Sequence, residues 1–311
     1  MTSQTVARVF AGIGVAVVLK ATYDFTSFLY FYLLSAPKYR RYLYGDAPYA
    51  LVTGATDGIG KAIAKELYHK GFNLVLHGRN PDKLKKVQEE IQSSFTTKRL
   101  VRLWIADASA PEVDFASALK DWEDIEITLV IHNVGGSCVK ATRIDAIPES
   151  SLLSDLRLNA TFPWLLTRAL LPKLRQADGP VELVFIGSIA GQLSVPGLIP
   201  YGASKAFLRQ LSGAIAADEQ FRSPTNVTTS YMLVGSVVTP GHIATPTLAT
   251  PLAEPFAKSV VAKIGSGRSV VIPWVWHAVR LGMVGLVPER LMKKAAASAA
   301  EEELRLNAKQ A

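Results

Sequence analysis

Short apolar runs alternate with longer amphipathic stretches between residues 48 and 265, whereas both ends of the chain follow other patterns. This alternation is typical of βαβ units, in which helices connect parallel strands. The stretch Lys61–Lys70 places Ile63 and Leu67 on one face before Gly71, which predicts a helix. Six strands are predicted: Tyr49–Val52, Asn73–His77, Leu100–Ala106, Thr128–His132, Val181–Gly187 and Asn226–Leu233. The pattern as a whole predicts an α/β fold with a Rossmann-type, doubly wound parallel sheet.

The N-terminal 45 residues are of a different kind. Nearly every side chain from Val9 to Leu34 is apolar or aromatic, and the two charged exceptions, Lys20 and Asp24, are close enough along a helix to neutralise each other. One helix of this length measures about 39 Å, which exceeds the ~30 Å hydrocarbon core of a bilayer. We expect residues 1–45 to form a hydrophobic membrane-anchor segment, tilted or re-entrant. A helix on the membrane surface and a cleaved signal peptide are the alternatives. The basic cluster that follows is typical of a cytosolic flank: Lys38, Arg40 and Arg41.

A third pattern begins near residue 266. The run Val270–Val287 is apolar, but Pro273 and Arg280 argue against a transmembrane span. Its tryptophans favour a helix at the boundary between water and lipid, and a helix packed on the protein's own core is the alternative. The end of the chain, Glu289–Ala311, is rich in Ala, Glu and Lys and predicts an exposed helix. We therefore expect residues 266–311 to form an amphipathic, helical C-terminal extension.

The composition excludes several classes of protein. With 49% hydrophobic and 19% charged residues, the chain is not a disordered protein. Its single cysteine, Cys138, excludes a disulfide scaffold and is expected to be a neutral thiol in a loop, and the five histidines are scattered, so we expect no metal site. The net charge of +8 comes from residues spread along the chain. We therefore expect no nucleic-acid partner, and the charge suits an anionic small molecule or a membrane surface.

A glycine-rich turn, Thr53–Gly60, lies between the first predicted strand and the first predicted helix. Small residues allow the backbone to approach a pyrophosphate closely, and the free amides and the dipole of the helix attract the anion. A glycine triplet alone is weak evidence, but a strand before it and a helix after it are the context that a dinucleotide site requires. We expect six residues of this turn to bind a cofactor: Gly54, Thr56, Asp57, Gly58, Ile59 and Gly60.

The end of the second predicted strand indicates which cofactor to expect. An NAD-specific site has an acidic residue there, which binds the ribose 2′-hydroxyl. This chain has His77-Gly78-Arg79-Asn80 instead, and a guanidinium pairs with a 2′-phosphate in a forked geometry. We therefore predict that Arg79 binds the cofactor and that the cofactor is NADP(H). A solvated Arg79 without a ligand is the alternative.

Two further segments carry groups suited to proton transfer. Ser188 follows the fifth predicted strand, and Tyr201 and Lys205 are four residues apart, which places them on one face of a helix. A free tyrosine has a pKa of about 10, and an adjacent cation lowers this pKa toward neutrality. We expect Tyr201 to be the proton donor, Lys205 to lower its pKa, and Ser188 to donate a hydrogen bond to a substrate carbonyl.

The turn, the serine and the Tyr-x-x-x-Lys pair resemble the classical short-chain dehydrogenase/reductase family in order and spacing, over about residues 48–265. The resemblance implies hydride transfer between a nicotinamide cofactor and a carbonyl carbon, with Tyr201 and Lys205 also touching the cofactor. It implies a fourth catalytic residue, Asn159, which holds a water for proton relay. It also implies four more cofactor contacts: Asp107, Asn133, Val237 and Thr239.

The chain departs from the family pattern at three positions. His132 and Val134 stand where the family usually has asparagine and alanine, and Val234 stands where a proline usually precedes Gly235. These changes affect packing around the cofactor and leave the expected catalytic residues in place.

The apolar first segment, its basic flank and the sequence Ala50–Lys61 resemble the membrane-bound branch of that family. This branch contains very-long-chain 3-oxoacyl-CoA reductases and 17β-hydroxysteroid dehydrogenases of the endoplasmic reticulum. The resemblance implies an NADP-binding reductase domain in residues 46–265 that acts on an apolar ketone, with a long-chain 3-oxoacyl-CoA of fatty acid elongation as the first choice. A steroid or secondary-metabolite ketone reductase and a non-enzymatic, nucleotide-binding membrane scaffold are the alternatives. We expect a catalytic domain that faces the cytosol on the endoplasmic reticulum, with a homo-oligomer left open.

Overall fold

The computed structural model describes residues 3–96, 98–136 and 143–284, together with positions 288, 290, 291, 294, 297 and 298. Cys138 and most of Glu289–Ala311 lie outside the described residues, so the expectations for them concern parts that the structure does not describe. The chain divides into two compact units, residues 1–37 and residues 38–311. Each unit is described by itself.

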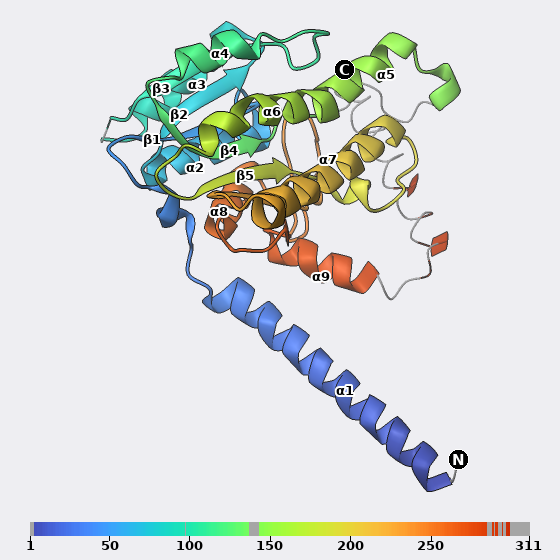
Figure 1. Cartoon of the computed structure of the whole chain (residues 1–311). Helices are drawn as coiled ribbons and strands as arrows, with labels where there is room; N and C mark the ends of the chain where they lie inside the picture. The colour runs from blue at the N-terminus through green and yellow to red at the C-terminus, as the bar shows by residue number, and fades with distance from the viewer. Residues whose placement is uncertain are drawn as a thin grey trace. The chain divides into compact units, whose positions relative to one another are not determined.

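The first unit is one long apolar helix. Helix α1 (Ser3–Leu29) continues into the π-helical turn η1 (Tyr30–Leu34), and the two are drawn in blue in Figure 1. Together they span 32 residues with a mean hydropathy of 1.6, so the helix is long and apolar enough to cross a bilayer. Lys20 Nζ lies 2.7 Å from a carboxylate oxygen of Asp24, as the four-residue spacing predicts.

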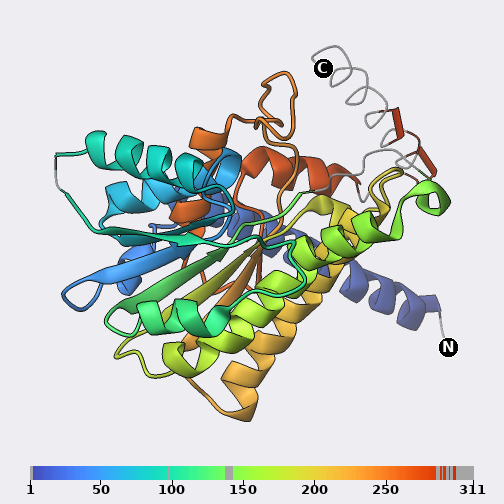
Figure 2. The same cartoon turned by 90° about the horizontal axis from the view of Figure 1, so that it is seen from above.

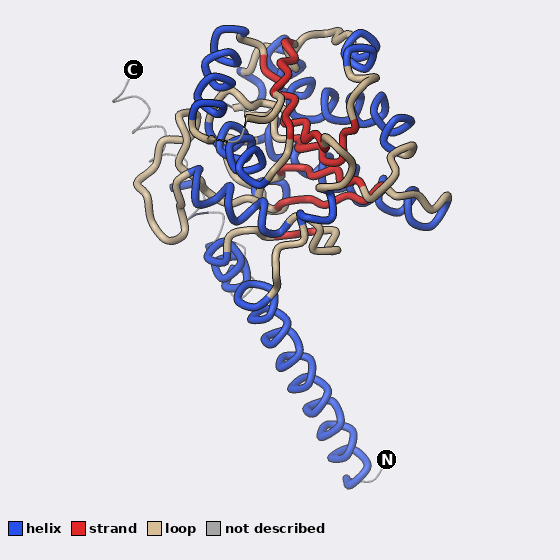
Figure 3. The backbone as a smooth tube through the Cα atoms, turned by 90° about the vertical axis from the view of Figure 1, so that its left-hand side faces the viewer, coloured by secondary structure: helices blue, strands red, loops and turns tan. Residues whose placement is uncertain are grey.

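The second unit is built on a parallel sheet of seven strands in the order β3-β2-β1-β4-β5-β6-β7, which Figure 3 shows in red with helices on both sides. The predicted doubly wound sheet is confirmed, and each of the six predicted strands is present with ends shifted by two residues at most. The strand bounds are β1 Pro48–Val52, β2 Asn73–Gly78, β3 Val101–Ile105, β4 Glu126–His132, β5 Val181–Ile186, β6 Val227–Met232 and β7 Val270–Val271.

Helices cover both faces of this sheet, as Figure 2 shows from above. Helices α2 (Gly58–Lys70), α3 (Pro81–Ser93) and α8 (Ala253–Lys263) cover one face, and α4 (Phe115–Asp121), α6 (Phe162–Leu174) and α7 (Ile199–Ala217) cover the other. The predicted helix before Gly71 is therefore confirmed as α2. Buried apolar side chains of α6 and α7 pack on the strands and form the core, among them Phe162, Leu166, Leu170 and Leu208.

Shorter elements join these helices. They are η2 (Tyr39–Tyr42), η3 (Ile144–Ala146), α5 (Glu149–Leu156), η4 (Arg157–Thr161), η5 (Ile189–Gly191), η6 (Asp218–Arg222) and α9 (Val275–Val284). The basic cluster of Lys38, Arg40 and Arg41 lies at and just before η2.

A buried carboxyl group holds η2 on the sheet. Glu182 of β5 accepts hydrogen bonds from the hydroxyls of Tyr42 and Ser230, at 2.7 and 2.6 Å, and from the backbone N–H of Gly265 at 2.7 Å. Thr128 of β4 adds a bond of 2.8 Å to the carbonyl of Tyr42. Burial raises the pKa of Glu182, and these three donors oppose that rise. The segment that follows the apolar helix is thereby fixed to two central strands.

The C-terminal segment differs from the expected helical extension. Its first element is β7, which pairs with β6, and the sequence pattern does not predict this strand because two residues are too short to show a period. Helix α9 follows, with His277 only 4% exposed. Trp276, Val279 and Met283 of the same helix are exposed, so α9 packs on the protein through one face and keeps apolar side chains on the other.

Candidate active site

The glycine-rich turn has the geometry of an anion cradle. Asp57 caps α2 by accepting the N–H of Gly58 at 2.8 Å, and Gly54 and Gly58 have positive φ angles of 64° and 52°, which favour glycine. A Cβ atom built on Gly60 would lie 2.2 Å from the carbonyl oxygen of Gly54. The turn therefore presents backbone rather than side chains, next to first-turn amides that have no acceptor within the helix. A pyrophosphate fits these donors.

Two polar side chains, those of Asn133 and Thr53, hold the backbone of the turn through hydrogen bonds. The amide nitrogen of Asn133 donates to the carbonyls of Thr53 and Gly54, at 3.0 and 3.2 Å. The hydroxyl of Thr53 accepts the N–H groups of Asn133 and Val134, at 3.0 and 3.1 Å. Asn133, the residue directly after β4, thus supports the turn at a position where the sequence predicts a cofactor contact. Thr53 is a bracing residue that the sequence pattern does not single out.

His77 fixes the turn from the neighbouring strand. Its Nδ1 atom accepts the N–H of Gly54 at 3.3 Å, and its ring stacks on Phe162 with the ring centres 4.9 Å apart. Burial lowers the pKa of His77 to about 3. The imidazole is therefore a neutral acceptor at physiological pH.

The residues expected at the adenosine end of the cofactor lie together. Arg79 is exposed at the end of β2, and its charge helps to lower the pKa of Asp107, after the larger effect of two hydrogen bonds from Ser109. Thr56 packs against the same strand end, since a Cβ built on Gly78 would lie 2.7 Å from its methyl carbon. Arg79, Asp107 and Thr56 therefore border one region beside the turn.

The expected catalytic side chains meet at the carboxyl end of β5. Ser188 follows β5 and caps η5, where its Oγ accepts the N–H of Ala190 at 3.1 Å. Its hydroxyl also interacts with the phenol of Tyr201, on the first turn of α7. Lys205, one turn later, lies with Nζ 5.5 Å from the centre of the Tyr201 ring and donates to the carbonyl of Ile186 at 2.9 Å.

The pKa of Tyr201 differs from the expectation that it is lowered. Burial raises the pKa of Tyr201, and the Ser188 hydroxyl opposes this rise without cancelling it. Burial lowers the pKa of Lys205 to about 8. The expected lowering of the Tyr201 pKa by Lys205 is not found, because the ammonium lies over the ring and bonds to Ile186 while desolvation acts on both groups. In this geometry the phenol keeps its proton at neutral pH.

Asn159 is held in a π-helical turn between α5 and α6. Its amide nitrogen donates to the carbonyl of Gly136 at 2.6 Å and to that of Asp155 at 2.9 Å, and its Oδ1 accepts the N–H of Gly136 at 3.0 Å. Single π-turns inside helices are frequent at functional sites, since they displace one residue from the regular helix. A Cβ built on Gly135 would lie 2.8 Å from Oδ1 of Asn159 and 3.0 Å from Nζ of Lys205. Asn159 and Lys205 therefore converge on one point.

The loop after β6 connects the two halves of the site. The carbonyl of Val234, two residues after the end of β6, accepts the N–H of Ile189 at 2.8 Å, directly beside Ser188. Farther along, a Cβ built on Gly58 would lie 3.1 Å from the methyl of Thr239. Val237, in between, is buried. The two predicted cofactor contacts, Val237 and Thr239, thus lie on a loop that runs from the neighbourhood of Ser188 to the glycine-rich turn.

Tyr231 of β6 is a site residue that the sequence pattern does not reveal. Its hydroxyl accepts the N–H of Ser188 at 3.1 Å and lies 3.1 Å from the carbonyl of Lys205, to which it donates. A Cβ built on Gly187 would collide with its ring, at 1.9 Å. One phenol therefore sets the backbone of both Ser188 and Lys205, and only a glycine fits beside it.

The structure shows what each of the three residues that depart from the family pattern contacts. His132 is buried, lies 3.0 Å from the Thr167 hydroxyl through Nε2 and stacks on Phe185, and burial lowers its pKa to about 3. It is a neutral core side chain. Val134 packs against Gly54 of the turn, and Val234 is the acceptor beside Ser188.

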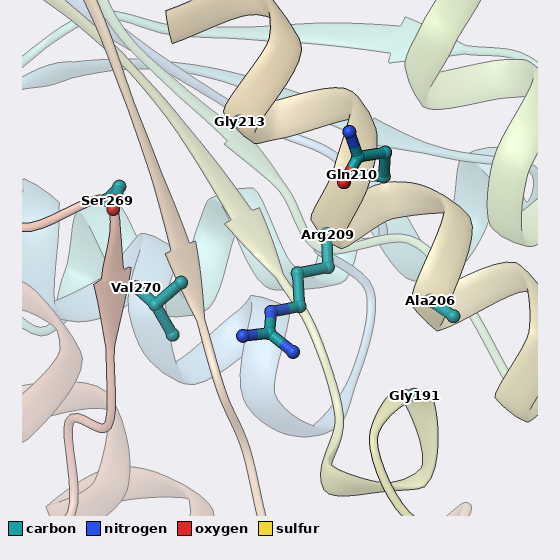
Figure 4. Close-up of a pocket in the computed structure, with 7 residues that line it drawn as sticks. All are labelled: Gly191, Ala206, Arg209, Gln210, Gly213, Ser269 and Val270. Carbon is teal, nitrogen blue, oxygen red and sulfur yellow. The ribbon is translucent and has the colours of Figure 1, made fainter.

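Two other features lie apart from this constellation. Among the described residues, no group of three or more His, Cys, Asp or Glu side chains gathers as metal ligands would. A pocket of about 370 Å³ lies between α7 and β7, where Arg209 reaches toward Val270 (Figure 4). None of the residues that line it is a predicted site residue: Gly191, Ala206, Arg209, Gln210, Gly213, Ser269 and Val270.

Comparison with known proteins assigns the family. The family model for short chain dehydrogenases matches residues 48–250. The very-long-chain 3-oxoacyl-CoA reductase of Kluyveromyces lactis is 30% identical over 261 residues, which cover 82% of this chain and 74% of that protein.

Solved structures agree on the fold. A short-chain dehydrogenase of Sphingobium yanoikuyae in complex with NADPH has a TM-score of 0.65 at 24% identity, with 79% of this chain and 95% of the other covered. A short chain dehydrogenase/reductase of Burkholderia phymatum in complex with NAD has a TM-score of 0.67 at 20% identity, with coverages of 78% and 92%. The chain therefore belongs to the short-chain dehydrogenase family, a family of oxidoreductases, on the branch represented by relatives named very-long-chain 3-oxoacyl-CoA reductase.

Proposed function

We propose that this protein is an NADPH-dependent reductase that transfers a hydride to the ketone carbonyl of an apolar substrate, most simply a long-chain 3-oxoacyl-CoA. The observation that carries the proposal is the arrangement of Ser188, Tyr201, Lys205 and Asn159 at the carboxyl ends of the strands, next to a turn that presents bare backbone. An open α/β sheet binds its ligands at that edge.

The side chains have distinct roles in this reaction. Tyr201 donates the proton to the carbonyl oxygen, because its raised pKa keeps the phenol protonated at neutral pH. Ser188 donates a hydrogen bond to the same oxygen and orients it. Lys205 provides a buried positive charge within one helical turn of Tyr201, and Asn159 holds the path by which the phenol regains its proton. A nicotinamide cofactor supplies the hydride when it is bound.

The choice of NADP(H) rests on Arg79. Its guanidinium is exposed at the strand end where a 2′-phosphate would lie, and Asp107, an acidic residue that borders the same region, already accepts two hydrogen bonds from Ser109. Solved relatives of this fold bind NADPH in one case and NAD in another, so the chain's own residues must carry the choice. Measured affinity for NADPH against NADH tests it.

The choice of substrate class rests on the relatives and on the physical properties of the chain. A relative at 30% identity is named for very-long-chain 3-oxoacyl-CoA reduction. The apolar helix Ser3–Leu34 would hold the protein near lipid substrates, and a net charge of +8 suits the anionic CoA moiety.

We further propose that residues 1–45 anchor the protein in the endoplasmic reticulum membrane, with the reductase domain of residues 46–265 and the C-terminal extension of residues 266–311 in the cytosol. Protease treatment of sealed microsomes tests this orientation. Digestion of the reductase domain in intact vesicles is expected, and its protection until detergent is added would contradict the proposal.

The decisive experiment on substrate is an assay of NADPH oxidation by the full-length protein in detergent or nanodiscs. A series of 3-oxoacyl-CoA esters of increasing chain length is compared with a panel of steroid ketones at equal concentration. We expect kcat/KM to rise with acyl length and to exceed that for every steroid by at least about tenfold. A higher kcat/KM for a steroid ketone would replace the proposed substrate class.

A further inference from the structure

The loop from Gly235 to Thr239 is held by a side chain from far along the chain. His277, near the start of α9, accepts the N–H of Gly235 on Nδ1 at 3.2 Å. Its Nε2 lies 3.1 Å from the carbonyl of Ser236 and 3.2 Å from that of Ala249. One acceptor and one donor on the same ring require a neutral imidazole with its hydrogen on Nε2. Burial lowers the pKa of His277 and favours that form.

The contact between the ring and the loop is tight. A Cβ built on Gly235 would lie 2.8 Å from Cδ2 and 2.9 Å from Nε2 of His277. No side chain fits at position 235 unless the imidazole moves. His277 is 4% exposed, so its ring shields these part-buried hydrogen bonds from water.

The same helix start also holds the segment that returns to this loop. The indole N–H of Trp274 donates to the carbonyl of Leu248 at 2.7 Å, next to the Ala249 carbonyl that His277 holds. The N–H of Val238 donates to the carbonyl of Pro251 at 2.9 Å. Residues Leu248–Pro251, at the end of the segment after Thr239, are therefore hydrogen-bonded both to the start of α9 and to the Gly235–Thr239 loop. His277 itself bonds to this arm and to the loop.

We propose that His277 is a positioning residue that locks the Gly235–Thr239 loop to the Leu248–Ala249 arm, so that cofactor affinity depends on this side chain of the C-terminal extension. The inference rests on the proposed function to the extent that this loop lies beside the nicotinamide. Its mechanical part, the fixing of the loop by the imidazole, stands on the hydrogen bonds alone. His277 lies after residue 250, where the match to the family model ends.

Two variants of His277 separate ring packing from hydrogen bonding. His277→Phe keeps an aromatic ring against Phe256, whose ring centre lies 5.8 Å away, and removes both nitrogens. His277→Asn keeps an acceptor near the position of Nδ1. Loss of bonds to part-buried backbone groups predicts an NADPH Kd about tenfold higher for His277→Phe, with a smaller increase for His277→Asn. Direct binding is read from cofactor fluorescence, with full-length protein.

A second readout follows the loop itself without cofactor or substrate. Limited proteolysis is expected to cut the stretch between Ser236 and Thr250 faster in His277→Phe than in the wild type. Trp274→Phe is the matched control, because it releases Leu248 alone and leaves Gly235 and Ser236 held. It is expected to change the NADPH Kd less than threefold.

Gly235→Ala tests the same lock if His277→Phe does not fold. The added methyl displaces the imidazole without changing it, and it is expected to raise the NADPH Kd to a similar extent. Folded variants of either kind with an NADPH Kd and cleavage rate within twofold of the wild type would overturn the proposal. Absence of NADPH binding by the wild type would instead overturn the proposed function, while the cleavage rates would still decide the role of His277.

Discussion

Asn159 and Lys205, which come from different helices, meet at Gly135. A Cβ on that glycine would lie 2.8 Å from Oδ1 of Asn159 and 3.0 Å from Nζ of Lys205. The amide and the ammonium therefore occupy the space that any side chain at position 135 would take.

Gly135→Ala is expected to lower kcat at least about tenfold, because the methyl group displaces the side chains of Lys205 and Asn159. Displacement of a reacting group by about 1 Å can lower the rate of the chemical step about 100-fold. Steady-state kinetics with NADPH and the best ketone substrate measure this effect. Gly213→Ala on α7 is the control, since a Cβ there has no atom within 4 Å. Equal kcat values for Gly135→Ala and the wild type would contradict the convergence.

Arg79→Ala is expected to reduce the preference for NADPH. Loss of a charge-assisted bond to a 2′-phosphate costs about 1.5–3 kcal/mol, which is about 10- to 150-fold in the KM for NADPH. The KM for NADH is expected to change little, because NADH has no 2′-phosphate. An unchanged ratio of the two KM values would show that Arg79 does not bind the phosphate.

The pH dependence of reduction is expected to report Lys205. Burial lowers the pKa of Lys205 to about 8, so the ammonium loses its proton as the pH rises through 8 and the positive charge beside Tyr201 disappears. Because the pKa of Tyr201 is raised, its phenol stays protonated over the same pH range. We therefore expect kcat/KM to be constant below about pH 7 and to fall above pH 8.

Lys205→Arg separates this effect from others, because a guanidinium stays protonated at every pH of the assay. The residual kcat/KM of this variant is expected to lack the decline near pH 8. The same decline in the arginine variant would assign it to another group.

Tyr42→Phe is expected to destabilise the protein by about 1–3 kcal/mol, because the buried carboxyl of Glu182 loses one of its three donors. Denaturant unfolding followed by circular dichroism measures the change. Tyr39→Phe on the same short helix is the control, since the described part of the chain shows no hydrogen bond to the Tyr39 hydroxyl. Equal losses of unfolding free energy in both variants would mean that the hydrogen bond to Glu182 adds no stability of its own.

The sequence pattern predicts a doubly wound parallel sheet and six of its strands, because runs rich in apolar residues alternate there with amphipathic stretches. It does not predict β7, whose two residues gain their strand conformation only from pairing with β6. The identity of Ser188, Tyr201, Lys205 and Asn159 as candidates comes from spacing and resemblance, and the structure brings these residues together.

The residues that hold the site in place are harder to find from sequence. Tyr231 and Thr53 are polar side chains in or directly after strands, and His77 and His277 act through backbone groups that lie far away in the chain. No local pattern records such long-range bonds. The sign of the Tyr201 pKa shift is missed for a similar reason, since desolvation depends on the packing of the whole site.

The central claim, that Tyr201 protonates a ketone which NADPH reduces, is tested most directly by one comparison. NADPH oxidation by a long-chain 3-oxoacyl-CoA is measured with wild-type protein and with Tyr201→Phe, after direct binding has shown an equal NADPH Kd for both. The wild type is expected to consume NADPH at least about 100-fold faster than the variant, the low end of the contribution of a general acid. A Tyr201→Phe variant that turns over within a fewfold of the wild type would contradict the claim.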